Sequence, residues 1–398
     1  MSKQIKLAVA AALLAAASSA NAGIMIPAGD WTLDIGGVVN AYYTTTRATG
    51  DTNVGFAPAN IGNNGNKTTS NITTGLLPNY LSVSGKTRQN DLDVAFTISI
   101  NPGASTTQSG EQGANQENRQ AFLTFGDKSW GSIKLGKDLG IYASDAILND
   151  MTLLGVGSAA GGLAGNTTTL GRIGTGFMYA DWKSQIAYSS PNWNGFSFTA
   201  GLTQGWDAQA FNSGLGSNQR SGAATAYEGK ASYEWTGDVA GKVWVSGITQ
   251  KVVGMNDRAE SVDIGATASV AGFGLTGYYY TGSGIGQTLQ LLGGFDAVGN
   301  ARDSNGGYVQ GTYTIPGVGT KLGLSWGQSK LDTNGGADVG GDVKDTMWTI
   351  GAYHPLTKHL NLVAEYSDVK HEISSAAAPA NNGEGKSKTV SLGAILFF

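Results

Sequence analysis

The chain has no cysteine and only 8 prolines in 398 residues. A fold without cysteine does not rely on disulfide bonds, even in a compartment that would permit them. Long apolar stretches are also scarce. The longest, residues 7–17, covers 11 residues, whereas a membrane-spanning helix needs about 20. The sequence therefore excludes a helical membrane protein.

Acidic residues outnumber basic ones. The chain has 25 lysines and arginines against 29 aspartates and glutamates, a balance that does not suggest a nucleic-acid-binding protein. Glycine, in contrast, is abundant at 61 residues, and the mean hydropathy is −0.12. This value is far from that of a protein built of apolar helices.

The amino terminus has the features of a secretion signal. Lys3 and Lys6 give it positive charge, residues 7–17 are apolar, and Ala20-Asn21-Ala22 is a small-x-small cleavage site. We expect cleavage of residues 1–22. The mature chain, residues 23–398, would then be one domain of 376 residues (398 − 22) with a formal charge of −6, because 23 basic residues remain against 29 acidic ones.

Side chains near the carboxyl terminus alternate in character at every second residue. Its even positions are Val390, Leu392, Ala394, Leu396 and Phe398. A period of two places them on one face of a β-strand. This apolar face continues to the last residue, where most domains end in poorly ordered polar residues. With a secretion signal at the other end, the pattern predicts a final strand that contacts lipid.

The same alternation predicts sixteen strands along the chain. They are expected to start near residues 30, 79, 91, 118, 130, 176, 195, 225, 239, 260, 273, 306, 319, 345, 359 and 386. Short and long connections alternate, which is typical of an outer-membrane β-barrel with short periplasmic turns and long outer loops. The alternation also keeps mean hydropathy near zero. A soluble β-sandwich would explain the alternation of side chains but not this rhythm of connections.

Sixteen strands leave a water-filled channel, whereas eight strands fill the interior with side chains. The parity of each strand predicts which charged residues face that channel. They are Asp34, Lys86, Arg88, Asp93, Lys134, Glu228, Lys230, Glu234, Lys242, Asp263, Lys321 and Glu365. Charges of both signs on an inner face fit a pore.

Several segments resemble the general diffusion porins of Gram-negative bacteria. Residues 118–137, with Asn118-Arg119-Gln120-Ala121 and Gly131-Ser132-Ile133-Lys134-Leu135-Gly136-Lys137, are similar to the run before the third loop of that family. Thr124 and Phe125 replace the usual Gly-Leu, and Lys137 replaces Arg. Residues 188–195 resemble its Tyr-x-Ser-Pro-x-x-x-Gly turn. The resemblance implies a sixteen-stranded antiparallel transmembrane barrel in the bacterial outer membrane.

The resemblance also implies a role for the third long loop, expected at residues 138–175. In that family the loop folds into the barrel, and its acidic residues face basic residues on the wall. By position, Asp145 and Asp150 are the acidic candidates. The basic candidates are Lys137 and Arg172, with Lys183 competing with Arg172. A wall position that is basic in enteric relatives is Tyr80 here, and Tyr80, Lys86, Arg88, Asp93 and Lys134 are expected to line the lumen.

Partners are likewise implied by the resemblance. They are two further copies of the chain in a homotrimer, outer-membrane lipid and lipopolysaccharide, and periplasmic chaperones. The barrel assembly machinery is expected to read the terminal aromatic residue, Phe398. No nucleic acid, metal or cofactor is expected.

Catalytic motifs carry little weight in this sequence. Gly323-Leu324-Ser325-Trp326-Gly327 matches G-x-S-x-G but lies inside an alternating strand, whereas the motif requires a strand-turn-helix elbow. The three histidines, His354, His359 and His371, are interpreted as surface residues. The sequence thus predicts a porin for passive diffusion of small hydrophilic solutes and ions. The alternatives are a substrate-selective channel, an adhesin-like interaction barrel and, last, a barrel enzyme.

Overall fold

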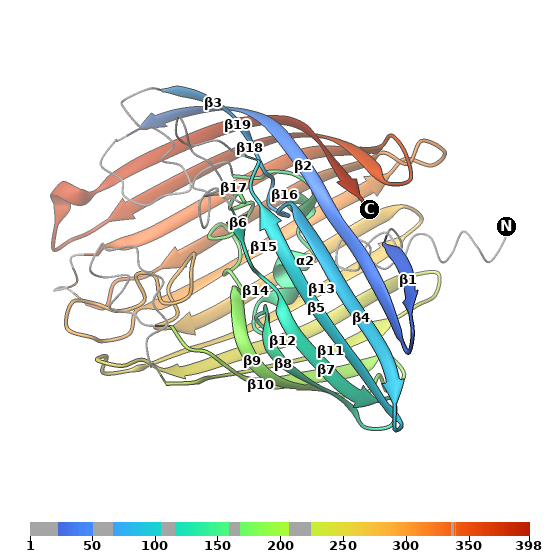
Figure 1. The fold of residues 1–398 in the computed structure, drawn as a ribbon. Helices are drawn as coiled ribbons and strands as arrows, with labels where there is room; N and C mark the ends of the chain where they lie inside the picture. Colours follow the sequence, from blue (N-terminus) through green and yellow to red (C-terminus); the bar gives the residue numbers. More distant parts are fainter. Residues whose placement is uncertain are drawn as a thin grey trace.

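The computed structural model describes residues 23–50, 67–104, 116–158, 168–206, 224–335, 338 and 340–398. They form one antiparallel sheet whose first and last long strands, β2 and β19, pair with each other and so close a barrel (Figure 1). Residues 1–22, which hold the expected secretion signal, lie outside the described part. Among the described residues, no helix is long and apolar enough to cross a membrane.

Sixteen long strands make up the wall, as the sequence predicts. In chain order they are β2 (Trp31–Gly50), β4 (Tyr80–Gln89), β5 (Leu92–Pro102), β7 (Ala121–Asp127), β8 (Gly131–Leu139), β9 (Trp182–Ser189), β10 (Phe196–Thr203), β11 (Ala226–Trp235), β12 (Ala240–Lys251), β13 (Arg258–Val270), β14 (Phe273–Ser283), β15 (Asp303–Thr314), β16 (Lys321–Leu331), β17 (Asp342–Pro355), β18 (Leu360–Ser374) and β19 (Gly383–Phe397).

Two details differ from the expected strands. β9 begins at residue 182 rather than near 176, so the third loop is longer than expected and runs over residues 140–181. β18 continues to residue 374, because its pairing with both β17 and β19 extends past the expected end of the strand. His371 consequently lies in β18 and is buried, which corrects its interpretation as a surface residue of the last loop.

Three short strands lengthen the sheet locally. β3 (Thr68–Thr73) pairs with the outer part of β2, and β6 (Gln116–Glu117) pairs with the end of β5. β1 (Ile24–Ala28) pairs with residues 31–35 of β2, on the side where β19 pairs with residues 38–50. The segment after the expected cleavage site therefore continues the line of the last strand.

Turn chemistry explains the tightest connections. β4 and β5 are joined by Asn90 and Asp91, whose φ angles are 49° and 63°. β13 and β14 are joined by Ala271 and Gly272, with φ angles of 49° and 86°. Positive φ at both central residues is the requirement of the type I′ turn, whose twist matches that of paired strands.

The alternating residues separate into an apolar outer face and a more polar inner face. Val39, Ile264, Leu324 and Leu392 are each more than half exposed on the outer face. Exposed apolar side chains on this scale would be unfavourable in water, but in a bilayer they contact lipid. The opposite parity of the same strands carries the charged residues that the sequence assigns to the lumen.

The last residue lies on the outer face where the barrel closes. The backbone amide of Gly37 in β2 donates to the Phe398 carbonyl at 2.8 Å, and the Phe398 amide donates back at 3.1 Å. Gly37 has no side chain, and a Cβ there would lie 2.8 Å from the Phe398 ring. The ring therefore covers Gly37, and the closing seam includes the terminal aromatic.

Inside the barrel lies α2 (Ser144–Leu148), labelled in Figure 1. The next helix of the third loop, η2 (Met151–Leu154), also packs against the inner wall. A third short helix, η3 (Pro379–Asn381), lies between β18 and β19. The largest apolar cluster joins the third loop to the wall. It contains Tyr142, Ile147, Ile173, Phe177, Met178, Trp244, Tyr278, Tyr280, Ile285 and Tyr308.

Candidate functional site: the loop-filled lumen

The third loop enters the lumen from β8 and binds first to the wall formed by β11, β12 and β13. Glu228 of β11 accepts two backbone hydrogen bonds, from the amides of Ile141 and Tyr142, each at 2.8 Å. The Tyr142 hydroxyl lies 2.6 Å from Ser261 Oγ on β13. A carboxylate that accepts successive backbone amides holds the chain in one position.

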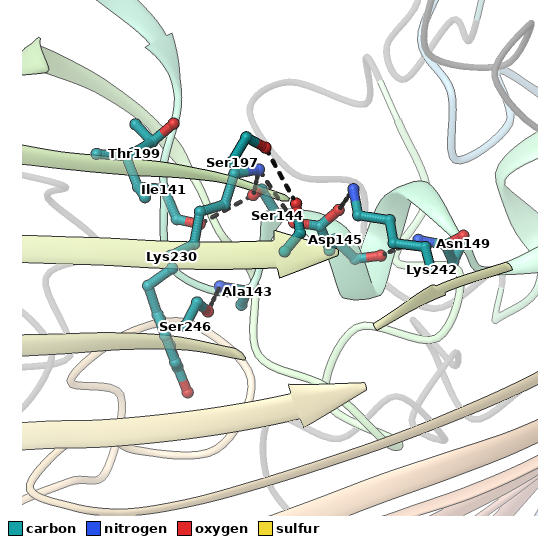
Figure 2. A network of polar contacts seen from close by, with 12 residues as sticks. Ile141, Ala143, Ser144, Asp145, Asn149, Ser197, Thr199, Lys230, Lys242 and Ser246 are labelled. Carbon is teal, nitrogen blue, oxygen red and sulfur yellow. Dashed lines mark hydrogen bonds and ion pairs between the residues drawn. The ribbon is translucent and has the colours of Figure 1, made fainter. Parts of the chain in front are cut away.

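α2 is then attached to the wall by a charged cluster (Figure 2). Asp145 binds Lys230 of β11 at 3.0 Å and Lys242 of β12 at 2.6 Å. Lys242 also lies 3.2 Å from Glu234. Burial alone would raise the pKa of Asp145, but the two ammonium groups outweigh it and hold that pKa below its usual range. The carboxylate is therefore charged at neutral pH.

The loop next contacts β15 and then reaches the opposite wall, at β2 and β18. Gln310 of β15 accepts the Met151 amide at 2.6 Å, and the Tyr42 hydroxyl of β2 donates to the Leu154 carbonyl at 2.8 Å. Glu365 of β18 accepts the amides of Val156 and Gly157 at 2.7 and 2.8 Å. One loop thus joins strands on both sides of the barrel.

Asp150 and Arg172 come together within this loop rather than across open water. Asp150 Oδ1 lies 3.9 Å from Arg172 Nε, and both side chains are fully buried. Asp150 also begins η2, accepting the Thr152 amide at 3.0 Å. Arg172 belongs to the returning part of the loop and donates to the Met347 carbonyl of β17 at 3.1 Å. The pair therefore links the outgoing and the returning parts of the loop.

The expected basic wall is only partly where the resemblance places it. Lys183 lies on the inner face of β9, but its ammonium is buried between Glu228 and Gln290. The expected position of Lys137 is wrong. In register it pairs with Ala121 of β7 and Ser184 of β9, on the face that carries the exposed Leu123 and Ile186.

Lys137 therefore points outward, because directly paired residues of adjacent strands share a face. Its Nζ donates to the Asn118 carbonyl at 2.7 Å. The neighbouring inner positions of β8 are Lys134 and Asp138, which form an ion pair with each other. Sequence reasoning had placed Lys134 on the inner face, but the contribution of Asp138 was not foreseen.

The expected lumen residues Lys86, Arg88 and Asp93 lie at the periplasmic end of the barrel, beside the turn between β4 and β5. Arg88 is 48 % exposed and binds Asp93 at 2.8 Å and Asp127 at 2.9 Å. Lys86 and Arg88 border a cavity of about 850 Å³ that opens at this end. Tyr80 is half-buried beside the apolar cluster of Val38, Tyr42 and Met151. The residues that border the cavity carry both signs of charge.

The sequence does not predict that Lys230 and Lys242 bind Asp145, although it places both lysines on the inner face. Lys230 and Lys242 have the parity of inner residues, and the resemblance supplied an acidic loop. No local pattern connects them, since they lie 85 and 97 residues from Asp145. Glu228 and Glu365 were likewise placed on the inner face, but not as anchors of the loop.

The family model described as Gram-negative porin matches residues 8–373. The chain belongs to this family. It is an outer-membrane porin, a water-filled β-barrel channel of the bacterial outer membrane for passive diffusion of small hydrophilic solutes and ions. A sequence search of curated proteins finds no match.

Solved structures resemble the porin over nearly its whole length. The anion-selective porin from Comamonas acidovorans has a TM-score of 0.62 at 14 % identity, covering 92 % of this chain and 100 % of that one. The outer membrane channel DcaP of Acinetobacter baumannii gives 0.66 at 17 %, covering 95 % and 100 %. OmpT of Vibrio cholerae, folded in vitro and in a trimer form, gives 0.53 at 15 %, covering 92 % and 99 %. At these identities the likeness establishes the fold.

Proposed function

We propose that the third loop, residues 140–181, forms the constriction of this porin. One observation carries the proposal. Glu228 and Glu365 each accept two backbone amides of the same loop, and their strands, β11 and β18, are seven positions apart in a ring of sixteen. A segment fixed to nearly opposite walls must cross the channel and narrow it.

Asp145, Lys230 and Lys242 are proposed to set the charge at this constriction. The lysine side chains stay 27 % and 22 % exposed, so part of each faces the lumen, while the Asp145 side chain is 5 % exposed. Glu234, 44 % exposed, adds a second acid beside Lys242. Two acids beside two bases largely cancel, so we expect weak ion selectivity, unlike the Comamonas relative described as anion-selective.

Reconstitution of the purified porin into planar bilayers tests this function. We expect open channels whose conductance rises with salt concentration and whose reversal potential in a KCl gradient is small. A bilayer that stays sealed at all voltages would contradict passive diffusion. A strongly ion-selective open channel would contradict only the assignment of charges at the constriction.

We further propose that the porin assembles as a homotrimer, which one structural neighbour adopts. Its molecular mass in mild detergent, measured by light scattering, tests this. Lipopolysaccharide around the barrel, periplasmic chaperones, and recognition of Phe398 by the assembly machinery belong to the same proposal. Removal of residues 1–22 is tested by mass spectrometry of the mature chain.

No catalytic role is proposed. Ser325 of the G-x-S-x-G match is buried in the middle of β16, with regular pairing to β15 and β17 on either side. A nucleophile elbow needs a sharp turn that exposes the serine. Hydrolysis of ester substrates by the reconstituted porin would contradict this assignment.

A further inference from the structure

A second loop also folds into the lumen. Residues 284–302 connect β14 to β15 and turn inward, placing Ile285 in the main apolar cluster beside Phe177 and Met178. The Thr288 carbonyl accepts the Tyr179 amide at 3.1 Å. This inner loop therefore packs on the returning part of the third loop.

Two glutamines three residues apart attach the inner loop to opposite walls. Gln287 Nε2 donates to Asp345 of β17 at 2.8 Å, and the other carboxylate oxygen of Asp345 lies 2.6 Å from His371. Gln290 Oε1 accepts Lys183 Nζ of β9 at 2.7 Å, while its Nε2 donates to the Tyr179 carbonyl at 3.0 Å.

The positions of these two anchors decide where the inner loop runs. β9 and β17 are eight positions apart in the ring of sixteen strands, which is the largest separation that the ring allows. A loop bonded to both must cross the outer part of the lumen. It divides the mouth into one half over β10–β16 and another over β18, β19, β2 and β4–β8.

An apolar cluster occupies part of the half over β10–β16. Leu291 and Phe295 of the inner loop are buried against Trp206, Val252 and Ala259, which belong to neighbouring loops and to β13. Apolar close packing of this kind excludes hydrated ions from the space that the cluster occupies.

We propose that the inner loop is a second narrowing element, and that Gln287 and Gln290 determine the size of solute that the porin admits. This inference goes beyond the constriction by the third loop. The third loop narrows the middle of the channel, whereas the inner loop narrows one half of its outer mouth.

The test compares single-channel conductance and solute size limits in bilayers and liposomes. The double variant Gln287→Ala, Gln290→Ala removes both anchors, and we expect conductance to rise by up to about twofold, because conductance follows the open width of a pore. Neutral polymers of graded size, added from the outer side, should enter at larger sizes than in wild type. Gln328→Ala is the matched control, since Gln328 lies on the outward face of β16 near the same rim.

Conductance and polymer size limit equal to or below wild type in the double variant would overturn the proposal. A loss of all channels in wild type would instead defeat the porin function itself, so the two failures are distinguishable. Folding of each variant is checked by the resistance of the barrel to unheated detergent electrophoresis.

A second variant keeps the proposal testable if the double variant does not fold. The chain has no cysteine, so Gln287→Cys with Asp345→Cys provides a single thiol pair that a short, reducible bis-thiosulfonate can join. The cross-linked protein should conduct like wild type, and reduction of the linker should raise conductance. Identical conductance before and after reduction would overturn the proposal.

Discussion

Replacing Asp145 by Asn should move the ion selectivity of the channel towards anions. The substitution keeps the size of the side chain and one oxygen acceptor, but it removes the negative charge that lies 3.0 and 2.6 Å from two lysines. At an effective dielectric constant near 20, each of these contacts corresponds to about 6 kcal/mol of Coulomb attraction before desolvation is subtracted. The variant therefore leaves Lys230 and Lys242 without their main counter-charge.

The effect on a permeating ion follows from the same relation. For an ion about 8 Å away at an intermediate dielectric constant of about 40, loss of one unit charge changes the energy by about 1 kcal/mol. Screening at 0.1 M salt, with a length of about 10 Å, reduces this to about 0.5 kcal/mol. Cations then become about 2.2-fold less favoured and anions about 2.2-fold more, so their ratio shifts by about fivefold.

Reversal potentials in a KCl gradient measure this ratio. Glu260→Gln is the matched control, because Glu260 loses the same charge but is 59 % exposed at the outer rim, on the outward face of β13. The double variant Lys230→Gln, Lys242→Gln should shift selectivity in the opposite direction. Both shifts should fade in molar salt, where the screening length is about 3 Å.

The pH dependence of selectivity provides a second test of the charge on Asp145. A depressed pKa means that Asp145 contributes stability above its unfolded pKa, and that this contribution is lost as pH falls through the lower folded value. Lowering the pH to about 5 should therefore not reproduce the variant, since an ordinary aspartate titrates near 3.9. If Asp145→Asn keeps the wild-type reversal potential at low salt, the cluster does not face the conducting path and our reasoning is refuted.

Three further outcomes are expected. Ile264→Arg, on the lipid-facing side at the middle of β13, should lower the free energy of unfolding of the barrel by about 2–4 kcal/mol. Thr267→Arg, on the inner face of the same strand, should lower it less. Equal losses in denaturant titrations with lipid vesicles would contradict the assigned faces. Deletion of Phe398 should lower the amount of folded porin in the outer membrane, and normal surface levels by immunoblot would rule out its role in assembly. Lys137→Gln should leave the reversal potential unchanged, because Lys137 points away from the lumen. A shift of selectivity towards cations would show that Lys137 lies at the constriction.

Much of the wall could be predicted from the sequence, because alternate residues of each strand face lipid and water and differ in polarity accordingly. Residues 258–270 alternate between outward Val262 and Ile264 and inward Ser261 and Asp263, and this contrast between lipid and water is complete within the segment. Asn90 and Asp91 similarly specify their turn locally. Strand number, the lumen-facing charges and the membrane location follow from such local patterns.

The course of the loops inside the barrel was not determined in this way. α2 has five residues, too short for a helical period to be visible, and Asp145 finds its partners on two strands far along the chain. Lys137 was misplaced because resemblance alone was used for its position, whereas the register of β8 turns it outward. The anchors Gln287 and Gln290 are polar residues of a loop with no periodic signal.

The sequence by itself thus determined the barrel wall. Side chains that face lipid and side chains that face water alternate at every second residue, so each strand shows this pattern independently of the others. Only the tertiary structure decided which loops cross the inside of the barrel and where they are bonded to its wall. The bonds that fix the third loop and the inner loop join residues that become neighbours only after opposite walls have closed around them, so no segment carries the information alone.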